Sequence, residues 1–299
     1  MLQFFKNTHY DVVNKRRITF GISLALIVLS LVSLFVRGLN YGIDFSGGAK
    51  MQVEFSQSIT AEELRAKFTE KNLGNPEIKS SGLNEYMITI NPENLDDANG
   101  ILEQALGGTD YTLLQIDKIG PKIGQELRSN SLKAVGIALL LVLIYITVRF
   151  EFHFAVGAVA ALAQDVLITL GLFSIFQWEI SMPVLAAFLT IVGYSLNDTI
   201  VIFDRIREDL KVHKGKPLAD IINFSINESL SRTVITSLTT FFVVIILALF
   251  GGQVLFGFSI AMVIGVIIGT YSSMFIAAPI LVVWGHKFKE KEKPLEKKK

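Results

Sequence analysis

The chain has 299 residues, of which 51% are hydrophobic, with a mean hydropathy of +0.49 and a formal net charge of +1. Charged residues make up 18%, below the roughly 25% of ordinary soluble domains, which argues against a soluble protein of two such domains. The absence of cysteine excludes a disulfide-stapled domain and any metal or redox site that needs thiolates.

Six apolar segments are long enough to cross a bilayer, whose core needs about 20 apolar residues per helix. The first follows Lys15, Arg16 and Arg17 but is too long for a signal peptide and lacks a small-residue cleavage site. We therefore interpret it as a retained helix. The predicted membrane helices cover residues 18–36, 131–148, 154–176, 180–203, 232–250 and 254–284.

The distribution of Lys and Arg predicts the orientation in the membrane. These residues are concentrated in segments 1–17, 204–231 and 285–299, whereas the short loops 177–182 and 251–253 contain none. The positive-inside rule then predicts a multi-pass protein of the cytoplasmic (inner) membrane with both termini in the cytoplasm. The lysine-rich tail, residues 285–299, is expected to be a solvated anchor that contacts anionic membrane lipids. No nucleic-acid partner is expected.

Residues 37–130 are predicted to form an extracytoplasmic domain, which has 14 acidic and nine basic residues. A capping box at Thr60 and Glu63 predicts the start of its first helix. The segments 50–55, 76–80, 86–90 and 111–116 resemble strands, and 60–73 and 95–106 resemble helices. The order βαββαβ is that of a ferredoxin-like domain. The predicted fold class is therefore an α-helical membrane protein, a six-helix bundle with an inserted extracytoplasmic α+β domain.

Three charged residues within the predicted membrane helices need an explanation: Asp165, Asp198 and Arg232. Each costs about 2.5–3.5 kcal/mol at a helix centre on insertion scales, so such residues persist where they have a partner or a function. At about 1.5 Å per residue, Asp198 and Arg232 reach similar depths on antiparallel neighbours, while Asp165 lies nearer the middle. We therefore predict an Asp198–Arg232 pair, with Asp165 as a weaker candidate for a proton relay.

Polar residues accompany these charges on the fourth and fifth membrane helices. Such hydroxyl stripes also occur where helices merely pack together, so that alternative stays open for the hydroxyls alone. The small residues at 261, 265, 269 and 273 predict a packing face on the sixth helix. The supporting polar residues are Tyr194, Ser195, Asn197, Thr199, Thr233, Thr236, Ser237 and Thr240.

Four sequence blocks together resemble the SecD/SecF family of protein-export membrane proteins. One follows the first helix and contains Gly42, Asp44, Gly47 and Gly48. The others are residues 120–127, 192–208 and 229–240, and the resemblance covers nearly the whole chain.

The resemblance implies a function that spacing alone does not show. It implies that the chain works with a separate SecD subunit and the SecYEG channel. Together they would use the proton motive force to draw an unfolded, translocating polypeptide across the membrane. It assigns proton conduction to Asp198 and Arg232, and it implies a proton gradient as the energy source, with no cofactor, metal or enzymatic reaction.

Three alternatives remain at this point. The chain could be a scaffold that stabilises the translocon without conducting protons. It could be an intramembrane protease with Asp165 and Asp198 as a dyad, which would need adjacent carboxylates. It could also be a small-molecule exporter, although six helices and a small outer domain leave little room for a substrate pocket.

Overall fold

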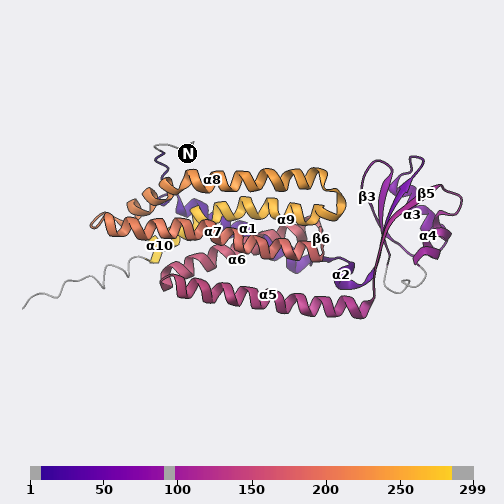
Figure 1. Ribbon diagram of the computed structural model, residues 1–299, viewed down its shortest axis with the longest axis horizontal. Helices are drawn as coiled ribbons and strands as arrows, with labels where there is room; N and C mark the ends of the chain where they lie inside the picture. Colours follow the sequence, from indigo (N-terminus) through magenta and orange to yellow (C-terminus); the bar gives the residue numbers. More distant parts are fainter. Residues whose placement is uncertain (1–7, 91–97, 285–299) are drawn as a thin grey trace, which may run out of the picture.

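Long helices form one elongated bundle, and a small α+β domain extends from one end of it (Figure 1). This computed structural model describes residues 8–90 and 98–284. Within that part of the chain, six helices are long and apolar enough to cross a membrane. The bundle consists of α1 (Arg16–Val36), α5 (Pro121–Arg149), α6 (Phe152–Phe176), α7 (Met182–Val212), α8 (Leu218–Phe250) and α9 (Gly252–Ser272), with α9 continuing through η2 (Ser273–Ala277) into α10 (Ala278–Trp284).

Several helices extend beyond the apolar segments that predicted them. Helix α5 begins ten residues before position 131, and α7 and α8 together occupy most of segment 204–231. Arg205 continues α7 past the apolar segment by pairing with Glu208 at 3.2 Å and with Asp209 at 3.3 Å, one turn further on. Hydropathy marks the part of a helix that suits lipid, whereas such charge pairs stabilise turns of the helix beyond that part.

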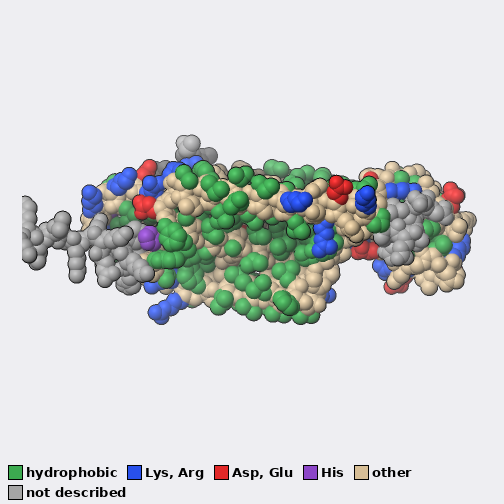
Figure 2. Space-filling view, turned by 90° about the horizontal axis from the view of Figure 1, so that it is seen from below, with side chains coloured by type: hydrophobic (Ala, Val, Ile, Leu, Met, Phe, Trp, Pro, Cys, Tyr) green, Lys and Arg blue, Asp and Glu red, His purple; other side chains and the backbone are tan. Residues whose placement is uncertain are grey.

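The bundle carries its apolar side chains outward. Figure 2 shows a band of hydrophobic side chains along the bundle, with Lys and Arg mainly toward its ends. Helix α5 is the least covered of the six, with side chains such as Leu141 and Val148 largely exposed. The ends of α1 and α10 nearest the chain termini lie at the end of the bundle away from the α+β domain (Figure 1). Residues 1–7 and the lysine-rich tail, 285–299, lie outside the described residues.

The α+β domain has a four-stranded antiparallel sheet in the order β3–β4–β2–β5. The predicted ferredoxin-like order is therefore confirmed, with two helices between the strands; the predicted residues 95–97 lie outside the described part. The elements are β2 (Gly48–Phe55), α3 (Ala61–Glu70), β3 (Glu77–Ser80), β4 (Glu85–Ile90), α4 (Ala98–Leu106) and β5 (Tyr111–Ile119).

Alternation along β2 explains how this sheet acquires a core. Met51 and Val53 point to the covered face and are fully buried, whereas Glu54 is exposed. Phe68 of α3 and Leu102 of α4 pack against this face. The resulting core is entirely apolar.

The predicted capping box begins α3. The Thr60 hydroxyl accepts from the Glu63 backbone N–H at 3.2 Å, and the Glu63 carboxylate accepts from the Thr60 backbone N–H at 2.8 Å. That backbone hydrogen bond lowers the pKa of Glu63 below its ordinary value. Two backbone donors that would otherwise be unsatisfied at the helix start are thereby paired.

Candidate functional site

The most deeply buried carboxylate of the bundle belongs to Asp165, on α6. Its side chain is fully buried, and one oxygen, Oδ2, accepts hydrogen bonds from Ser195 of α7 at 2.5 Å and Ser272 of α9 at 2.9 Å. The other oxygen, Oδ1, has no hydrogen-bond partner within the described residues. A buried carboxylate with one unpaired oxygen is costly when ionised, so the energy of this three-helix contact depends on whether Asp165 carries a proton.

Asp198 lies on α7, three residues after Ser195, and is also buried. Its Oδ2 accepts a hydrogen bond from Ser237 of α8 at 3.3 Å. The Ser237 hydroxyl in turn lies 2.7 Å from that of Thr270 on α9. The predicted carboxylate site between the fourth and fifth membrane helices therefore exists, and α9 contributes to it.

Arg232 of α8 is near Asp198 without pairing with it. The guanidinium acts on Asp198 electrostatically, yet the ion pairs of the described residues do not include the two together. The Arg232 side chain is exposed on the outer surface of the bundle. This structure therefore contains no direct ion pair between Asp198 and Arg232, because α8 turns Ser237, rather than Arg232, toward the carboxylate. Their pairing during the working cycle stays a prediction.

The polar stripe of α8 divides between two faces of the helix. Ser229, Thr233 and Ser237 are buried, at four-residue spacing. Thr236 is exposed and its hydroxyl bonds to the backbone of its own helix, while Thr240 is half-buried and does the same. The inward face of α8 therefore runs through Ser229, Thr233 and Ser237, and Arg232 and Thr236 lie outside it.

The polar residues predicted on α7 also differ in their surroundings. Ser195 and Thr199 are buried, and Thr199 lies 2.8 Å from Ser273. Tyr194 is partly buried, but its hydroxyl is buried without a partner in the described part of the chain. Asn197 is exposed on the outer face.

Helix α9 and the η2 segment that continues it supply three site residues that the sequence patterns did not identify: Thr270 and Ser272 of α9, and Ser273 of η2. They flank Gly269, where an added Cβ would lie 3.1 Å from Ser195 Cβ, so the predicted small-residue face does pack against α7. The helix changes at Ser273 into the five-residue π-helix η2. Such π segments often occur at functional sites. The sequence feature that could have identified these site residues is the presence of three hydroxyl side chains within an apolar helix.

Asp165 and Asp198 contact different serines and share none of their hydrogen-bond donors. This is a pair of separate carboxylate sites linked through α7. In the described residues there is no group of three or more His, Asp and Glu side chains that could hold a metal ion.

The glycine-rich motif after α1 occupies the boundary between the bundle and the α+β domain. Its first part, β1 (Asn40–Tyr41), pairs in parallel with β6 (Glu179–Ile180), the short strand between α6 and α7. The motif then forms α2 (Ile43–Ser46), where the Asp44 carboxylate accepts from the Met182 backbone N–H at 2.7 Å. Asp44 thereby caps the first turn of α7, where a negative charge is favourable.

A side chain would not fit at three positions of the motif: Gly42, Gly47 and Gly48. At Gly42 a Cβ would collide with the Glu179 side chain. At Gly47, with φ +78°, it would lie 3.0 Å from Pro121 Cα at the start of α5. At Gly48, with φ +138°, it would lie 2.7 Å from the Ile90 carbonyl oxygen. The motif therefore holds the domain, α5 and the α6–α7 turn in close contact.

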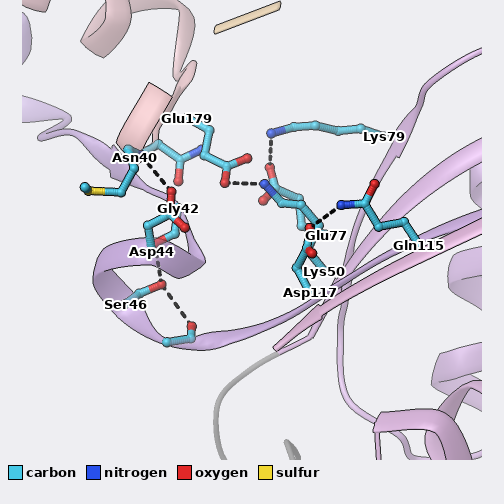
Figure 3. A network of polar contacts seen from close by, with 12 residues as sticks. Asn40, Gly42, Asp44, Ser46, Lys50, Glu77, Lys79, Gln115, Asp117 and Glu179 are labelled. Carbon is cyan, nitrogen blue, oxygen red and sulfur yellow. Dashed lines mark hydrogen bonds and ion pairs between the residues drawn. The ribbon is translucent and has the colours of Figure 1, made fainter. Parts of the chain in front are cut away.

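An ion pair that the sequence did not reveal crosses the same boundary. Lys50 of β2 and Glu179 of β6 meet at 2.5 Å, and their side chains are only 20% and 22% exposed. Figure 3 shows this pair beside Gly42 and Asp44, at the point where the domain meets the bundle. A separation of 129 residues along the chain left no local signal for it.

The fold and these sites define a class: six-helix membrane proteins with polar sites inside the bundle and a ferredoxin-like domain inserted after the first helix. Residues 101–287 match the family described as "Protein export membrane protein SecD/SecF, C-terminal", and residues 32–59 match the "SecD/SecF GG Motif". The chain belongs to the SecD/SecF family.

Curated relatives match the chain over nearly its whole length. The protein translocase subunit SecF of Rhodothermus marinus is 43% identical over 294 residues, covering 94% of this chain and 95% of the relative. That of Desulfurispirillum indicum is also 43% identical, covering 92% of this chain and 94% of the relative.

Solved structures agree in fold. SecDF from Thermus thermophilus, described as a translocon-associated membrane protein, has a TM-score of 0.86 at 37% identity over 94% of this chain. SecDF in a super-membrane-facing form has a TM-score of 0.74 at 35% identity over 97% of this chain. This chain spans only 39% and 41% of those two longer chains.

Proposed function

We propose that the chain is an accessory subunit of the Sec protein-export machinery that couples the proton motive force to late steps of translocation. Its partners in this proposal are a SecD subunit, the SecYEG channel and the unfolded polypeptide in transit. The observation that carries the proposal is Asp198, a buried carboxylate held by Ser237, with Arg232 near it but unpaired. The names of the relatives and the translocon association of the solved SecDF support the same assignment.

A carboxylate in this position can convert a proton movement into a helix movement. One charge crossing the membrane potential supplies about 2.3 kcal/mol per 100 mV. When Asp198 is ionised, attraction to Arg232 and the Ser237 bond favour one arrangement of α7 against α8. Protonation removes the attraction and lets the other arrangement dominate.

Asp165 extends this polar path toward α6 and α9. Ser195 donates to Asp165 and lies one helical turn from Asp198 on the same buried face of α7. Movement of α7 at Asp198 would therefore change the hydrogen bonds of Asp165. In this proposal Asp165 is a second proton-binding position, and the coupling requires no cofactor and no enzymatic step.

The need for a partner subunit follows from the outer face of α7. Pro183, Ala186, Thr190, Gly193 and Asn197 are exposed there at three- and four-residue spacing. Small and polar residues in this pattern suit close packing by another membrane helix better than contact with lipid.

Arg232 of α8 is exposed as well. A guanidinium exposed within a membrane helix is costly unless protein or water covers it. The part of the longer SecDF chains that this chain does not match is consistent with a SecD subunit as that cover.

The orientation follows from the distribution of charge. The beginning of α1, the end of α10 and the α7–α8 turn lie together at the end of the bundle opposite the α+β domain (Figure 1). The described residues there include Lys15, Arg207, Lys211, Lys214 and Lys216. The positive-inside rule then supports cytoplasmic termini in the inner membrane, with the α+β domain on the outer side.

The decisive experiment uses inverted membrane vesicles that contain this chain, a SecD subunit and the SecYEG channel. Asp198→Asn keeps the side-chain size but cannot ionise, so we expect export to fall to the level measured without a proton gradient. Asp220→Asn, at an exposed position in the first turn of α8, is the matched control and should retain full stimulation.

Co-purification with SecD establishes that the Asp198→Asn complex is assembled. Full stimulation of export by that assembled complex would contradict the proposal and favour a scaffold that does not conduct protons.

A further inference from the structure

The glycine-rich motif lies outside the polar path just described, yet it contacts the turn between the two helices that carry Asp165 and Asp198. Helix α6, with Asp165, ends at Phe176, and α7, with Asp198, begins at Met182. The turn between them contains Glu179. The polar contacts of the motif with the bundle are made to this turn and to the beginning of α7, and its packing contacts also reach the beginning of α5.

Those contacts are of three independent kinds. A backbone bond joins Gly42 N–H to the Ile180 carbonyl at 2.8 Å and extends the β1–β6 ladder. The Asp44 carboxylate holds the Met182 N–H at the start of α7. The Lys50–Glu179 ion pair connects the turn to β2, the central strand of the sheet beside β4 and β5.

Steric contacts remove the remaining freedom of the motif. Glycine at 47 and 48 lets the chain pass against Pro121 and Ile90, and a Cβ at Gly124 of α5 would lie 2.9 Å from the Gly47 nitrogen. The motif, the sheet and the beginning of α5 are therefore in close packing contact. A displacement of the α6–α7 turn can act on the domain through these contacts.

We propose that Lys50, Glu179 and Asp44 are positioning residues that fasten the α+β domain to the α6–α7 turn, so that movement of α7 at Asp198 is delivered to the domain. This inference rests on the proposed function, because it names the element through which that function reaches the outer side. The Lys50–Glu179 ion pair and the bond from Asp44 to the beginning of α7 stay formed during the working cycle. Together they are a rigid connection between the membrane sites and the domain, which we call the strut.

The experiment separates coupling from proton conduction by measuring both in the same vesicles. Lys50→Met keeps the aliphatic stem and removes the charge that holds Glu179. We expect gradient-stimulated export to fall about fivefold or more, the scale of typical coupling between sites. Proton flux should stay at the wild-type level, because Asp165 and Asp198 are untouched.

Two further variants distinguish coupling from a general loss of structure. Lys79→Met removes the exposed Lys79–Glu77 pair in the same domain, also visible in Figure 3, and should leave both readouts unchanged. The exchange Lys50→Glu with Glu179→Lys restores an opposite-charge pair and should recover most of the lost export. Normal export by Lys50→Met, or a failure of the exchange to restore it, would overturn the inference.

A covalent lock tests whether the contact stays closed. The chain has no cysteine, so a Lys50→Cys, Glu179→Cys double variant introduces the only pair available for a bifunctional thiol cross-linker. The cross-linked protein should export at the wild-type rate. Export that stops on cross-linking and returns on cleavage of the linker would show a latch that must open, and would contradict the strut.

The outcome for the strut is distinguishable from the outcome for the proposed function. If the wild-type complex shows no proton flux that depends on Asp198, the proposed function fails. If that flux is present and Lys50→Met leaves export unchanged, the strut alone fails.

Discussion

The α+β domain and the helix bundle place their polar groups in opposite ways. The domain has an entirely apolar core around residues such as Met51 and Phe68, with its charged groups at the surface. The bundle presents apolar side chains outward and buries Asp165, Asp198 and several hydroxyls between its helices. Apolar burial stabilises the domain. The bundle also contains buried polar sites, whose desolvation costs free energy and which helix packing alone would not require.

This contrast indicates where function resides. A domain whose described residues include no buried charge is suited to move as a rigid body. The described part of the bundle buries three carboxylates that accept hydrogen bonds, Asp165, Asp198 and Asp209, so its internal contacts can change when one of them gains or loses a proton. The predictions below test this difference by changing matched residues in the two regions.

The largest loss of stability is expected from the apolar core of the domain. Phe68→Ala removes a fully buried ring and should cost about 3–5 kcal/mol of the free energy of unfolding of the domain. Hydrogen exchange of β2 and α3 in the intact protein measures this directly. Leu83→Ala, at a side chain that is 92% exposed, is the control and should change little. Comparable exchange in both variants would contradict the core described here.

A smaller loss is expected at the boundary between the regions. Gly48→Ala combines strain at positive φ with a contact to Ile90, and should cost about 1–3 kcal/mol or slightly more. Gly74→Ala shares the positive φ, at +91°, but has open space around its Cβ. Thermal unfolding should show the larger decrease for Gly48→Ala. Equal decreases would mean that backbone strain alone, and not close packing of the motif, governs this position.

Within the bundle, removal of a single hydroxyl should lower stability only where that hydroxyl donates a hydrogen bond to a carboxylate. Ser272→Ala removes one of two donors to Asp165 and should destabilise the bundle by roughly 1–2 kcal/mol. Ser259→Ala, on the same helix, removes a buried hydroxyl that has no partner within the described residues, so its effect should be near zero. Resistance to unfolding in detergent compares the two, and equal effects would argue against a specific Asp165 site.

The smallest change concerns the capping box of α3. Thr60→Ala should cost about 1 kcal/mol, measured by exchange of the first turn of α3. The pKa of Glu63 is lower in the folded protein than its ordinary 4.5, so its stabilisation is complete above that pH. It is lost as the pH falls through the folded pKa. Exchange of this turn that stays constant on acidification would contradict the carboxylate bond.

Sequence patterns predicted the elements well because those depend on local spacing. The alternation in β2, the capping box at Thr60 and the apolar length of the membrane helices each follow from neighbouring residues. The ferredoxin-like strand order followed from the order of elements. The helix ends were less predictable, since α7 and α8 continue into water through charge pairs such as Arg205 with Glu208.

The candidate site was predictable in its residues but not in its partners. Buried charges within apolar segments identified Asp165 and Asp198. Whether Arg232 or Ser237 faces Asp198 depends on how α8 is rotated about its axis. The spacing of residues along the sequence does not determine that rotation. Contacts such as Lys50 with Glu179 depend on the docking of two distant segments, so only the folded chain reveals them.

The central claim is that Asp198 takes up and releases protons while Arg232 responds to its charge. The most direct measurement is proton uptake into proteoliposomes holding this chain with its SecD partner, followed by an internal pH indicator under an imposed membrane potential. We predict uptake by the wild-type complex and none above background for Asp198→Asn or Arg232→Gln. Equal uptake by the wild-type and Asp198→Asn complexes would contradict the account.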